Sequence, residues 1–247
     1  MTRLDQALVE RGLCESREKA RRAVLAGLVR VNAQSARKPS DSVRPGDALT
    51  LEAGEKFVSR GGHKLEHALK HFHLDVAGSV ALDLGASSGG FTDCLLQHGA
   101  AKVFAVDVGQ GQLAWKLRQD PRVVVMERTN ARLLTAARFP QPFAPADLAV
   151  IDCSFISLRK ILPAAVGLLK PNGKIVALVK PQFEAGKTEA DKGRGVIRDA
   201  AIHERVLGEL QKFVTEQSGL CWQNVVESPL LGPAGNKEFL VLIEKSR

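Results

Sequence analysis

Apolar runs alternate with amphipathic stretches along the chain from residue 80 to its end. The short runs are typical of buried strands, and the longer stretches, with apolar residues three and four apart, are typical of helices. Strands are expected at 80–85, 102–109, 123–127, 146–154, 174–180, 221–229 and 237–245, and helices at 91–99, 112–120, 158–169 and 200–219. This alternation predicts an α/β fold with helices on both faces of a mostly parallel sheet, and an antiparallel hairpin formed by the last two strands at the sheet edge.

Residues 1–57 follow a different pattern, with shorter elements and more turn residues. The expected elements are a helix that ends at Gly12, a helix over 17–26 capped by Ser16, and strands over 28–32 and 48–51. These elements predict a compact α+β domain. We therefore expect three parts, namely this domain, a linker with a helix at 58–79, and the α/β domain at 80–247.

The linker region contains a glycine pair, Gly61-Gly62, that predicts a hinge, and four histidines that cluster on the helix after it. Some of these histidines are four residues apart, as on a metal-binding face, but no cysteine or Glu-x-x-His pattern accompanies them. We therefore expect no metal site, and we expect the histidines to line a basic groove.

The formal net charge is +8 and the isoelectric point is near 9.5, which favours a polyanionic partner such as nucleic acid or an anionic membrane surface. Charge alone fits a soluble basic protein equally well. The four cysteines are scattered and predict neither a zinc site nor a disulfide framework, which is typical of a cytoplasmic protein. No signal peptide and no apolar run of membrane-spanning length are found, so a membrane location is not expected.

Basic side chains share faces of the helix expected at 17–26. Arg17 and Arg21 are four residues apart, and Lys19 and Arg22 are three apart. Such a helix suits contacts with phosphates along an RNA backbone. A solvated helix surface, partly neutralised by neighbouring glutamates, explains the same charges.

A glycine-rich turn lies between the first strand and the first helix of the α/β region. Ligands of open α/β sheets bind at the carboxyl ends of the strands, and glycine lets a ligand approach the backbone closely. Gly85 and Gly89 do not have the spacing of the pyrophosphate-binding G-x-G-x-x-G pattern. Asp83, just before the turn, is more typical of methyltransferases, in which an ammonium group lies near the turn.

The next two strands end on side chains that suit a nucleoside. Asp107 follows Asp83 by one βαβ unit, and its carboxylate can accept hydrogen bonds from both ribose hydroxyls. An ordinary turn carboxylate at a strand end is the simpler alternative. Asn130, after the third strand, can hydrogen-bond adenine or its surroundings.

Charged residues directly follow two apolar strands, where burial alone predicts none. Asp152 ends the fourth strand and Lys180 ends the fifth, so both are expected at neighbouring strand ends. Lys64 lies on the linker helix, and Glu238 opens the last strand. Methyl transfer requires in-line alignment and control of the nucleophile's proton, which a lysine oriented by a carboxylate can provide.

The N-terminal region resembles, along its whole length, the RNA-binding module first known from ribosomal protein S-four. The residues that carry this resemblance are Arg3-Leu4-Asp5, Gly12, Ser16-Arg17, Gly27, Val29, Val31-Asn32, Pro39-Ser40 and Gly46-Asp47. The resemblance implies a structured RNA ligand. The RNA-binding residues expected on this basis are Arg3, Arg17, Arg21, Arg22 and Asn32.

Nearly the whole chain resembles the TlyA family, in which such a module precedes an FtsJ-like RNA 2′-O-methyltransferase domain. The resemblance rests on "SRGGHKLE", "DLGASSGGFT", "ERTNAR", "DCSFISL", "VKPQFEAG" and "GNKEFLV". It implies a Rossmann-like methyltransferase fold with seven strands and one antiparallel edge strand, and S-adenosyl-L-methionine as the cofactor. It also implies 2′-O-methylation of cytidine in ribosomal RNA, with ribosomal RNA or a ribosomal subunit as the partner.

Residue roles follow from the same resemblance. In order, Lys64, Asp152, Lys180 and Glu238 match the Lys-Asp-Lys-Glu tetrad, with Lys180 as the base or proton-steering group and Asp152 as its orienter. The cofactor-binding residues expected are Asp83, Gly85, Ser87, Gly89, Phe91, Asp107, Asn130 and Asp152. FtsJ itself has a different pair in place of Ser87-Ser88 and an indole in place of Phe91, which leaves the individual contacts open.

Two other functions remain open from the sequence. Because proteins of this family are often labelled hemolysins, a membrane-lytic protein is one, although no amphipathic membrane-active stretch is found. A non-catalytic RNA-binding assembly factor is the other. The charged, glycine-rich segment 183–199 fits either a mobile lid over the RNA or a plain surface loop. Neither the modified nucleotide, the ribosomal subunit nor the oligomeric state can be determined from the sequence.

Overall fold

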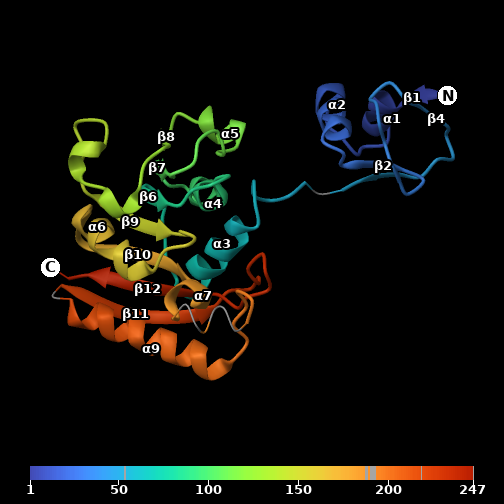
Figure 1. Cartoon of the computed structure of the whole chain (residues 1–247). Coiled ribbons are helices and arrows are strands. Elements are labelled where there is room, and N and C mark those ends of the chain that lie inside the picture. The colour runs from blue at the N-terminus through green and yellow to red at the C-terminus, as the bar shows by residue number, and fades with distance from the viewer. Residues whose placement is uncertain (53, 187–188, 190–192, 218, 247) are drawn as a thin grey trace. The chain divides into compact units, whose positions relative to one another are not determined.

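The computed structural model describes residues 1–52, 54–186, 189, 193–217 and 219–246. The chain forms two compact units, Met1–Lys56 and Phe57–Arg247, and each has its own hydrophobic core (Figure 1). Part of the segment 183–199, for which a lid or a loop is predicted, lies outside the described residues.

The N-terminal unit packs two short helices against short strands. Its elements are β1 (Thr2–Arg3), α1 (Leu4–Glu10), α2 (Arg17–Leu25), β2 (Val29–Val31), β3 (Gln34–Ser35), β4 (Ser42–Val43) and β5 (Leu49–Leu51). Strands β3, β2 and β5 form an antiparallel sheet, and β1 pairs with β4. The Ser16 hydroxyl accepts a hydrogen bond from the Lys19 amide at 3.2 Å, so the predicted cap of α2 is formed. Leu4, Leu8 and Val24 are buried between the helices and strands.

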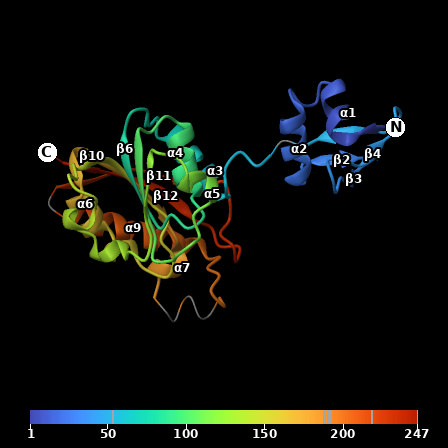
Figure 2. The same ribbon diagram turned by 90° about the horizontal axis from the view of Figure 1, so that it is seen from above.

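The second unit is built on a seven-stranded sheet in the order β11-β12-β10-β9-β6-β7-β8 (Figures 1 and 2). Its strands are β6 (Val80–Leu84), β7 (Lys102–Val106), β8 (Val123–Met126), β9 (Ala146–Ile151), β10 (Leu169–Val179), β11 (Leu220–Glu227) and β12 (Phe239–Lys245). Strands β6 to β10 run parallel to their neighbours among themselves, whereas β12 pairs antiparallel with both β10 and β11. The predicted mostly parallel α/β fold is confirmed, with the last two strands as a hairpin at one edge.

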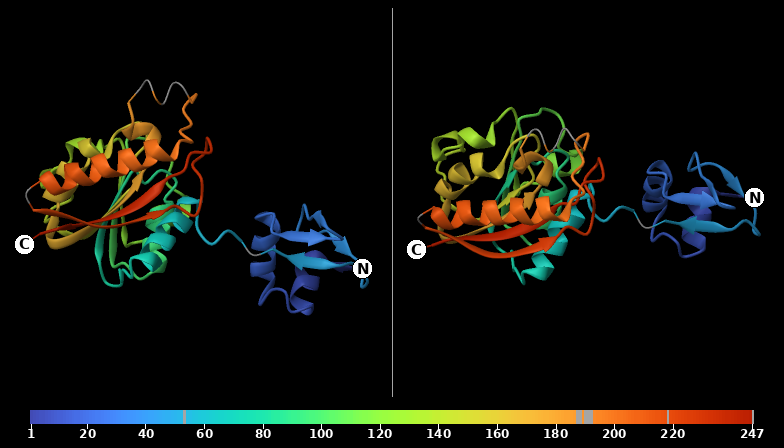
Figure 3. Two further views of the ribbon diagram at one scale, coloured as in Figure 1. Left: turned by 90° about the horizontal axis from the view of Figure 1, so that it is seen from below. Right: turned by 60° about the horizontal axis from the view of Figure 1, so that its bottom comes forward.

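Helices cover both faces of this sheet (Figures 2 and 3). Buried side chains of α3 (Gly61–His71), α4 (Gly90–Gln97) and α5 (Trp115–Arg118) join one core. Those of α6 (Leu162–Gly167) and α9 (Ala200–Glu216) join the core on the opposite face. The remaining short elements are α7 (Pro181–Glu184), η1 (Ala131–Leu133), η2 (Ala136–Arg138) and η3 (Leu158–Lys160).

The strand order defines where a ligand can enter. From β6 the chain proceeds outward through β7 and β8, and then returns to the other side of β6 with β9 and β10. The loops after β6 and β9 therefore diverge to opposite faces and leave a crevice at the carboxyl ends of the strands. This is where the predicted site residues gather.

Three predicted elements differ most from the structure. The single helix expected at 158–169 is wrong, because η3 and α6 are separate; Pro163 lies in the first turn of α6, where its missing amide hydrogen leaves no bond unmade. The helix expected at 112–120 is reduced to α5, preceded by Ala114 in an extended conformation. Strand β10 begins at Leu169 rather than 174, with an irregularity in its pairing with β9 before Lys174.

Candidate active site

The turn between β6 and α4 requires glycine for two physical reasons. Gly85 and Gly89 have φ angles of +90° and +93°, a region that side chains with a Cβ avoid. A Cβ on Gly85 would also lie 2.7 Å from the carbonyl oxygen of Asp152, and a Cβ on Gly89 would lie 2.2 Å from Leu117. The glycines therefore let this turn pack directly against the end of β9 and against α5.

Close glycine packing also brings α3 to the site. A Cβ on Gly90 would lie 2.9 Å from the amide nitrogen of Gly62, and a Cβ on Gly62 would overlap Phe57. The amino ends of α3 and α4 can approach this closely only because Gly90 has no side chain, and Phe57 can pack against α3 only because Gly62 has none. The approach places Lys64, on the second turn of α3, beside the glycine-rich turn.

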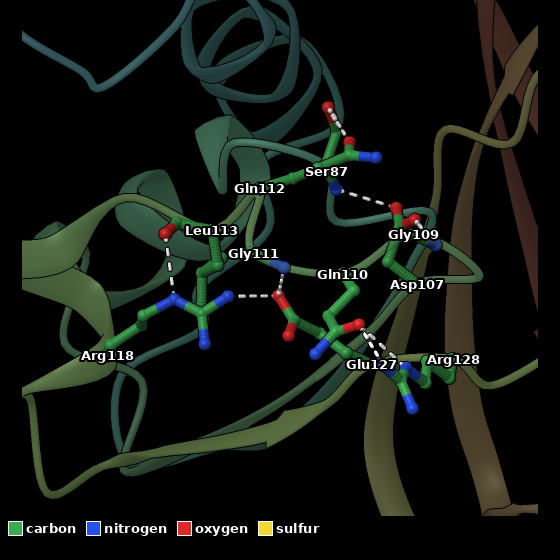
Figure 4. A network of polar contacts seen from close by, with 10 residues as sticks. All are labelled: Ser87, Asp107, Gly109, Gln110, Gly111, Gln112, Leu113, Arg118, Glu127 and Arg128. Carbon is green, nitrogen blue, oxygen red and sulfur yellow. Dashed lines mark hydrogen bonds and ion pairs between the residues drawn. The ribbon is translucent and has the colours of Figure 1, made fainter.

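Asp107, at the end of β7, holds two loops together. Its Oδ2 accepts a hydrogen bond from the Ser87 amide at 2.8 Å, and its Oδ1 accepts one from the Gly109 amide at 2.7 Å (Figure 4). Each carboxylate oxygen retains a second lone pair, so the side chain can still accept hydrogen bonds from a ribose. The carboxylate is thus fixed in place before any ligand binds.

Glu127 fixes the loop that follows Asp107, and sequence reasoning did not identify it. Its Oε1 accepts hydrogen bonds from the Gly111 amide at 2.9 Å and from the Arg118 guanidinium (Figure 4). The backbone amides and Arg118 lower the pKa of Glu127, so it remains ionised. Gln112, on the same loop, contacts the Ser87 hydroxyl and borders the cavity described next.

A cavity of about 400 Å³ lies over the carboxyl ends of β6, β7 and β9. Asp107 and Asn130 line it together with Gly85, Ser87 and Asp152. The Asn130 Oδ1 accepts a hydrogen bond from the Arg132 amide at 3.0 Å and caps η1, which leaves the side-chain NH₂ group as the donor that can face a ligand.

A second cavity, of about 270 Å³, contains all four residues of the predicted tetrad. The Nζ of Lys180 lies 2.6 Å from Oδ1 of Asp152, and the Nζ of Lys64 lies 2.5 Å from Oε2 of Glu238. The fold brings these two ion pairs together from α3, from the ends of β9 and β10, and from the residue before β12. Phe91 also lines this cavity, beside the tetrad rather than in the larger cavity.

The two ion pairs differ in burial. Lys64 and Glu238 are 7% and 1% exposed, so each needs the other to offset the cost of removing its charge from water. Lys180 is 8% exposed, whereas the Asp152 side chain is 23% exposed. The lysine ammonium groups therefore lie at the wall of the cavity, with little access to bulk water.

The two cavities share part of their walls. Gly85, Ser87, Asp152 and Ser154 line both of them. Ser154, which sequence reasoning missed, accepts a hydrogen bond from the Nζ of Lys180 at 2.9 Å. A group that passes from one cavity to the other therefore passes beside the Lys180–Asp152 pair.

Asp83 lies behind the glycine-rich turn and is fully buried. Thr92 donates a hydrogen bond to its Oδ2 at 2.6 Å, but its Oδ1 has no hydrogen-bond partner among the described residues. Burial raises the pKa of Asp83 to about 7, and the nearby carboxylates of Asp152 and Asp107 add to the rise, although the Thr92 hydrogen bond opposes it. Burial thus favours the neutral carboxyl, and a cationic ligand nearby would favour the ionised form.

An exposed aromatic ring borders the larger cavity. Phe155 has a φ of +62° and is 90% exposed, although phenylalanine ordinarily avoids both conditions. Its ring lies 5.1 Å from that of Phe183, measured between centroids. The chain turns sharply after Ser154 and presents this ring to solvent, which no hydrophobic pattern predicts.

The arginines predicted to bind RNA fall into two groups. Arg3 and Arg17 both donate to the buried carboxylate of Asp5, at 2.9 and 3.2 Å, and with Arg21 they border a surface cavity of the N-terminal unit. Arg22 instead pairs with Glu18 on the exposed side of α2.

Asn32 is held within the N-terminal unit. It has a φ of +51°, its Oδ1 accepts a hydrogen bond from the Ala48 amide at 2.8 Å, and its Nδ2 donates to Asp47 at 2.9 Å. Asn32 thereby joins the turn after β2 to the turn before β5. Its contacts are those of a turn-stabilising residue.

The histidines of α3 do not form one cluster, because His63 contacts a different group from His67 and His71. The His63 ring packs edge-on against Phe57, and the rings of His67 and His71 stack at 6.1 Å. Within the described part of the chain, no three His, Cys, Asp or Glu side chains are arranged to hold a metal ion. Over the same residues, no helix has the length and apolar character needed to cross a bilayer.

Comparison with known proteins defines the class. A family model described as FtsJ-like methyltransferase matches residues 57–245, and one described as the S4 domain matches residues 2–49. The fold and this match define a methyltransferase, so the predictions of an enzyme and of S-adenosylmethionine as its methyl donor are confirmed.

Three individual proteins refine this assignment. The chain is 48% identical to a Mycobacterium tuberculosis protein named 16S/23S rRNA (cytidine-2′-O)-methyltransferase TlyA, over 97% of this chain and 88% of that protein. It is 41% identical to Hemolysin A of Brachyspira hyodysenteriae, over 96% and 98%. A solved structure from Streptococcus thermophilus is 45% identical, covers 99% of this chain and 88% of its own, and has a TM-score of 0.74. The chain belongs to the TlyA family of FtsJ-like methyltransferases, as the motif resemblance predicts.

Proposed function

We propose that this protein transfers a methyl group from S-adenosylmethionine to the 2′-hydroxyl of a cytidine in ribosomal RNA. The observation that carries the proposal is the shared wall of the two cavities. One cavity has a fixed carboxylate and an amide suited to a nucleoside, and the other has two lysine–carboxylate pairs. The names of the TlyA relatives support the choice of ribose and of cytidine.

The residues of the larger cavity fit the proposed cofactor. Asp107 can accept hydrogen bonds from the ribose hydroxyls, and the NH₂ group of Asn130 can donate to an adenine ring nitrogen. Gly85 lines both cavities and has no side chain to occupy the place where the methionine part would lie, and the Asp83 oxygen that lacks a partner among the described residues can supply negative charge behind the turn. When bound, S-adenosylmethionine supplies an electrophilic methyl group, and its sulfur takes the electron pair of the broken C–S bond.

The residues of the smaller cavity handle the acceptor. As a ribose oxygen bonds to the methyl carbon, its hydroxyl proton must leave, and Lys180 is placed to accept or steer that proton. Asp152 holds Lys180 at the cavity wall. The buried Lys64–Glu238 ion pair forms another part of this wall, and its fixed charges would position the ribose. Most of the rate gain in such a site comes from alignment, because the sulfonium already makes the methyl group reactive.

The Phe155 ring suits the base of the acceptor nucleotide. Bases of single-stranded or unstacked RNA bind aromatic side chains by stacking. The ring is exposed and supported by Phe183 beside the cavity where the cofactor would bind. A base stacked there would help hold its ribose near the tetrad.

The N-terminal unit supplies RNA affinity. Arg3, Arg17 and Arg21 border one surface cavity and present guanidinium groups that suit RNA phosphates. Functionally, we keep the division into an RNA-binding domain at 1–57, a linker with a helix at 58–79 and a catalytic domain at 80–247. The linker helix contributes Lys64 to catalysis. This substrate implies a cytoplasmic enzyme acting on one or both ribosomal subunits.

Incubation with radiolabelled S-adenosylmethionine and each isolated ribosomal subunit tests the proposal. Label is expected on the ribose of one or a few cytidines, located by nuclease mapping. Label on a base, on protein, or on neither subunit would contradict it. Subunits from a strain that lacks the gene provide the unmethylated substrate, and heat-denatured enzyme provides the blank.

A further inference from the structure

The Nζ of Lys180 contacts two acceptor side chains, Asp152 and Ser154, and the two contacts differ in geometry. The Asp152 Oδ1 lies 2.6 Å from the Nζ but makes no aligned hydrogen bond with any described residue. Ser154 Oγ lies 2.9 Å from the same nitrogen and accepts an aligned hydrogen bond. Charge attraction is weakly directional, whereas a hydrogen bond fixes direction. The direction of the ammonium group is therefore determined by Ser154.

Ser154 also has a particular place between the cavities. It lines both of them, as Asp152 does, whereas Lys180 lines only the smaller one. The segment after β9 holds both acceptors, two residues apart, and Phe155 then turns the chain away with a φ of +62°. The serine hydroxyl consequently lies at the wall that the two cavities share.

We propose that Ser154 is a positioning residue for methyl transfer, which orients the Lys180 amino group toward the acceptor hydroxyl at the shared wall of the two cavities. A lysine side chain has four rotatable bonds, and a single ion pair leaves its nitrogen free to rotate about the carboxylate. Ser154 fixes one N–H direction and Asp152 attracts the nitrogen by charge, so another position on the nitrogen, an N–H or a lone pair, can face the cavity that Lys180 lines. This inference rests on the proposed function and assigns a role to a residue outside the tetrad.

The main test replaces Ser154 by alanine and by threonine. Ser154→Ala is expected to lower kcat about 10- to 100-fold, which is the range for losing one hydrogen bond to a charged group. The KM for S-adenosylmethionine should stay unchanged, and Ser154→Thr, which keeps the hydroxyl, should restore most of kcat. Ser88→Ala is the matched control for the lysine labelling described next, because Ser88 makes no hydrogen bond to Lys180 among the described residues.

A second measurement does not depend on activity. Acetic anhydride labels exposed or mobile lysine amines, and mass spectrometry gives the labelling rate of each lysine. Lys180 should be labelled faster in Ser154→Ala than in the wild type or in Ser88→Ala, while Lys64, held by Glu238, should be unaffected. The thermal unfolding temperature should not change, since Ser154 is exposed.

The outcomes separate the two proposals. If the wild type methylates RNA while Ser154→Ala has wild-type kcat and unchanged Lys180 labelling, the role of Ser154 is wrong and the proposed function stands. Loss of cofactor affinity without rescue by threonine would make Ser154 a cofactor or structural residue and also overturn the inference. If the wild type methylates no RNA, the proposed function fails, and unchanged Lys180 labelling would then reject the positioning role independently.

Discussion

Two buried aspartates, one in each unit of the molecule, have opposite electrostatic surroundings. Two guanidinium groups lower the pKa of Asp5 to about 2, whereas burial and neighbouring carboxylates raise the pKa of Asp83 to about 7. The negative charge of Asp5 is already paired with Arg3 and Arg17, and these two side chains remain about half exposed. Asp83 is hydrogen-bonded by Thr92, with no cationic partner among the described residues. The first unit thus presents cations to a polyanion, and the second keeps negative charge for a cationic cofactor.

The largest effect on activity should come from replacing Lys180, one of the buried charges in the second unit. Lys180→Ala is expected to lower kcat for RNA methylation by roughly 10²–10⁴-fold, the range for removing a general acid or base. Binding of S-adenosylmethionine should persist, because Lys180 does not line the cavity proposed for it. Filter-based counting of transferred methyl groups and calorimetry of cofactor binding measure the two effects. An unchanged turnover rate would remove Lys180 from the mechanism.

Replacing Asp5, whose charge is paired with two arginines, should lower the stability of the first unit. Because the folded pKa of Asp5 is about 2, below its ordinary value of 3.8, its ionised form stabilises the fold above about pH 4. That contribution, about 1 kcal/mol because water screens the half-exposed arginines, is lost as pH falls toward 2. Residues 1–56 of the Asp5→Asn variant should therefore unfold more easily than the wild type at pH 7. The variant should not show the loss of stability between pH 4 and pH 2 that Asp5 causes in the wild type.

Hydrogen exchange of the amides in the N-terminal unit, followed from pH 7 downward, gives the stability of that unit alone. Glu18→Gln is the control, since it breaks the exposed pair with Arg22 and should have an effect near zero. Equal effects of the two substitutions would show that Asp5 does not organise the arginines more than a surface charge does.

Removing the carboxyl group of Asp83 should weaken cofactor binding and leave the fold intact. Asp83→Asn is expected to raise the Kd for S-adenosylmethionine about 10-fold, through loss of one negative charge close to the cation. Since the folded pKa is raised to about 7, the wild type without cofactor loses stability as pH rises from about 4 to 7. The asparagine variant should lack this decline.

Thermal unfolding at pH 5 and pH 8, with and without cofactor, compares the two proteins. At pH 8 without cofactor, the variant should unfold at the same or a higher temperature than the wild type. A variant that is less stable at both pH values and binds cofactor normally would make Asp83 a purely structural residue.

The smallest effect is expected at the exposed ring. Phe155→Ala should raise the KM for RNA about fivefold, equivalent to about 1 kcal/mol of base stacking, without changing cofactor affinity. Phe155→Tyr keeps the stacking face and serves as the control. If alanine and tyrosine behave alike, the ring contributes nothing to RNA binding, and the second unit recognises its substrate through charge alone.

The order of elements and the tetrad could be predicted, whereas several partners of the site could not. Apolar runs identified all seven strands of the sheet, and four of them, β7 to β10, end near a charged or polar residue that stands out in the sequence. Ser154 and Glu127 do not stand out, since a serine and a glutamate near strand ends are ordinary surface residues. Their roles depend on Lys180 and on the amide of Gly111, which lie 26 and 16 residues away.

By itself, the sequence determined the alternation of strands and helices, the glycine-rich turn, the resemblance to the TlyA family and the identity of the four charged residues. These features are local, because hydrophobic period, turn chemistry and motif order are properties of neighbouring residues. Only the tertiary structure decided that Asp83 is buried without a cationic partner among the described residues, that Asp5 is held between two arginines, and that Ser154 accepts a hydrogen bond from Lys180. Burial and pairing depend on segments far apart in the chain, so their energies exist only once those segments are packed together.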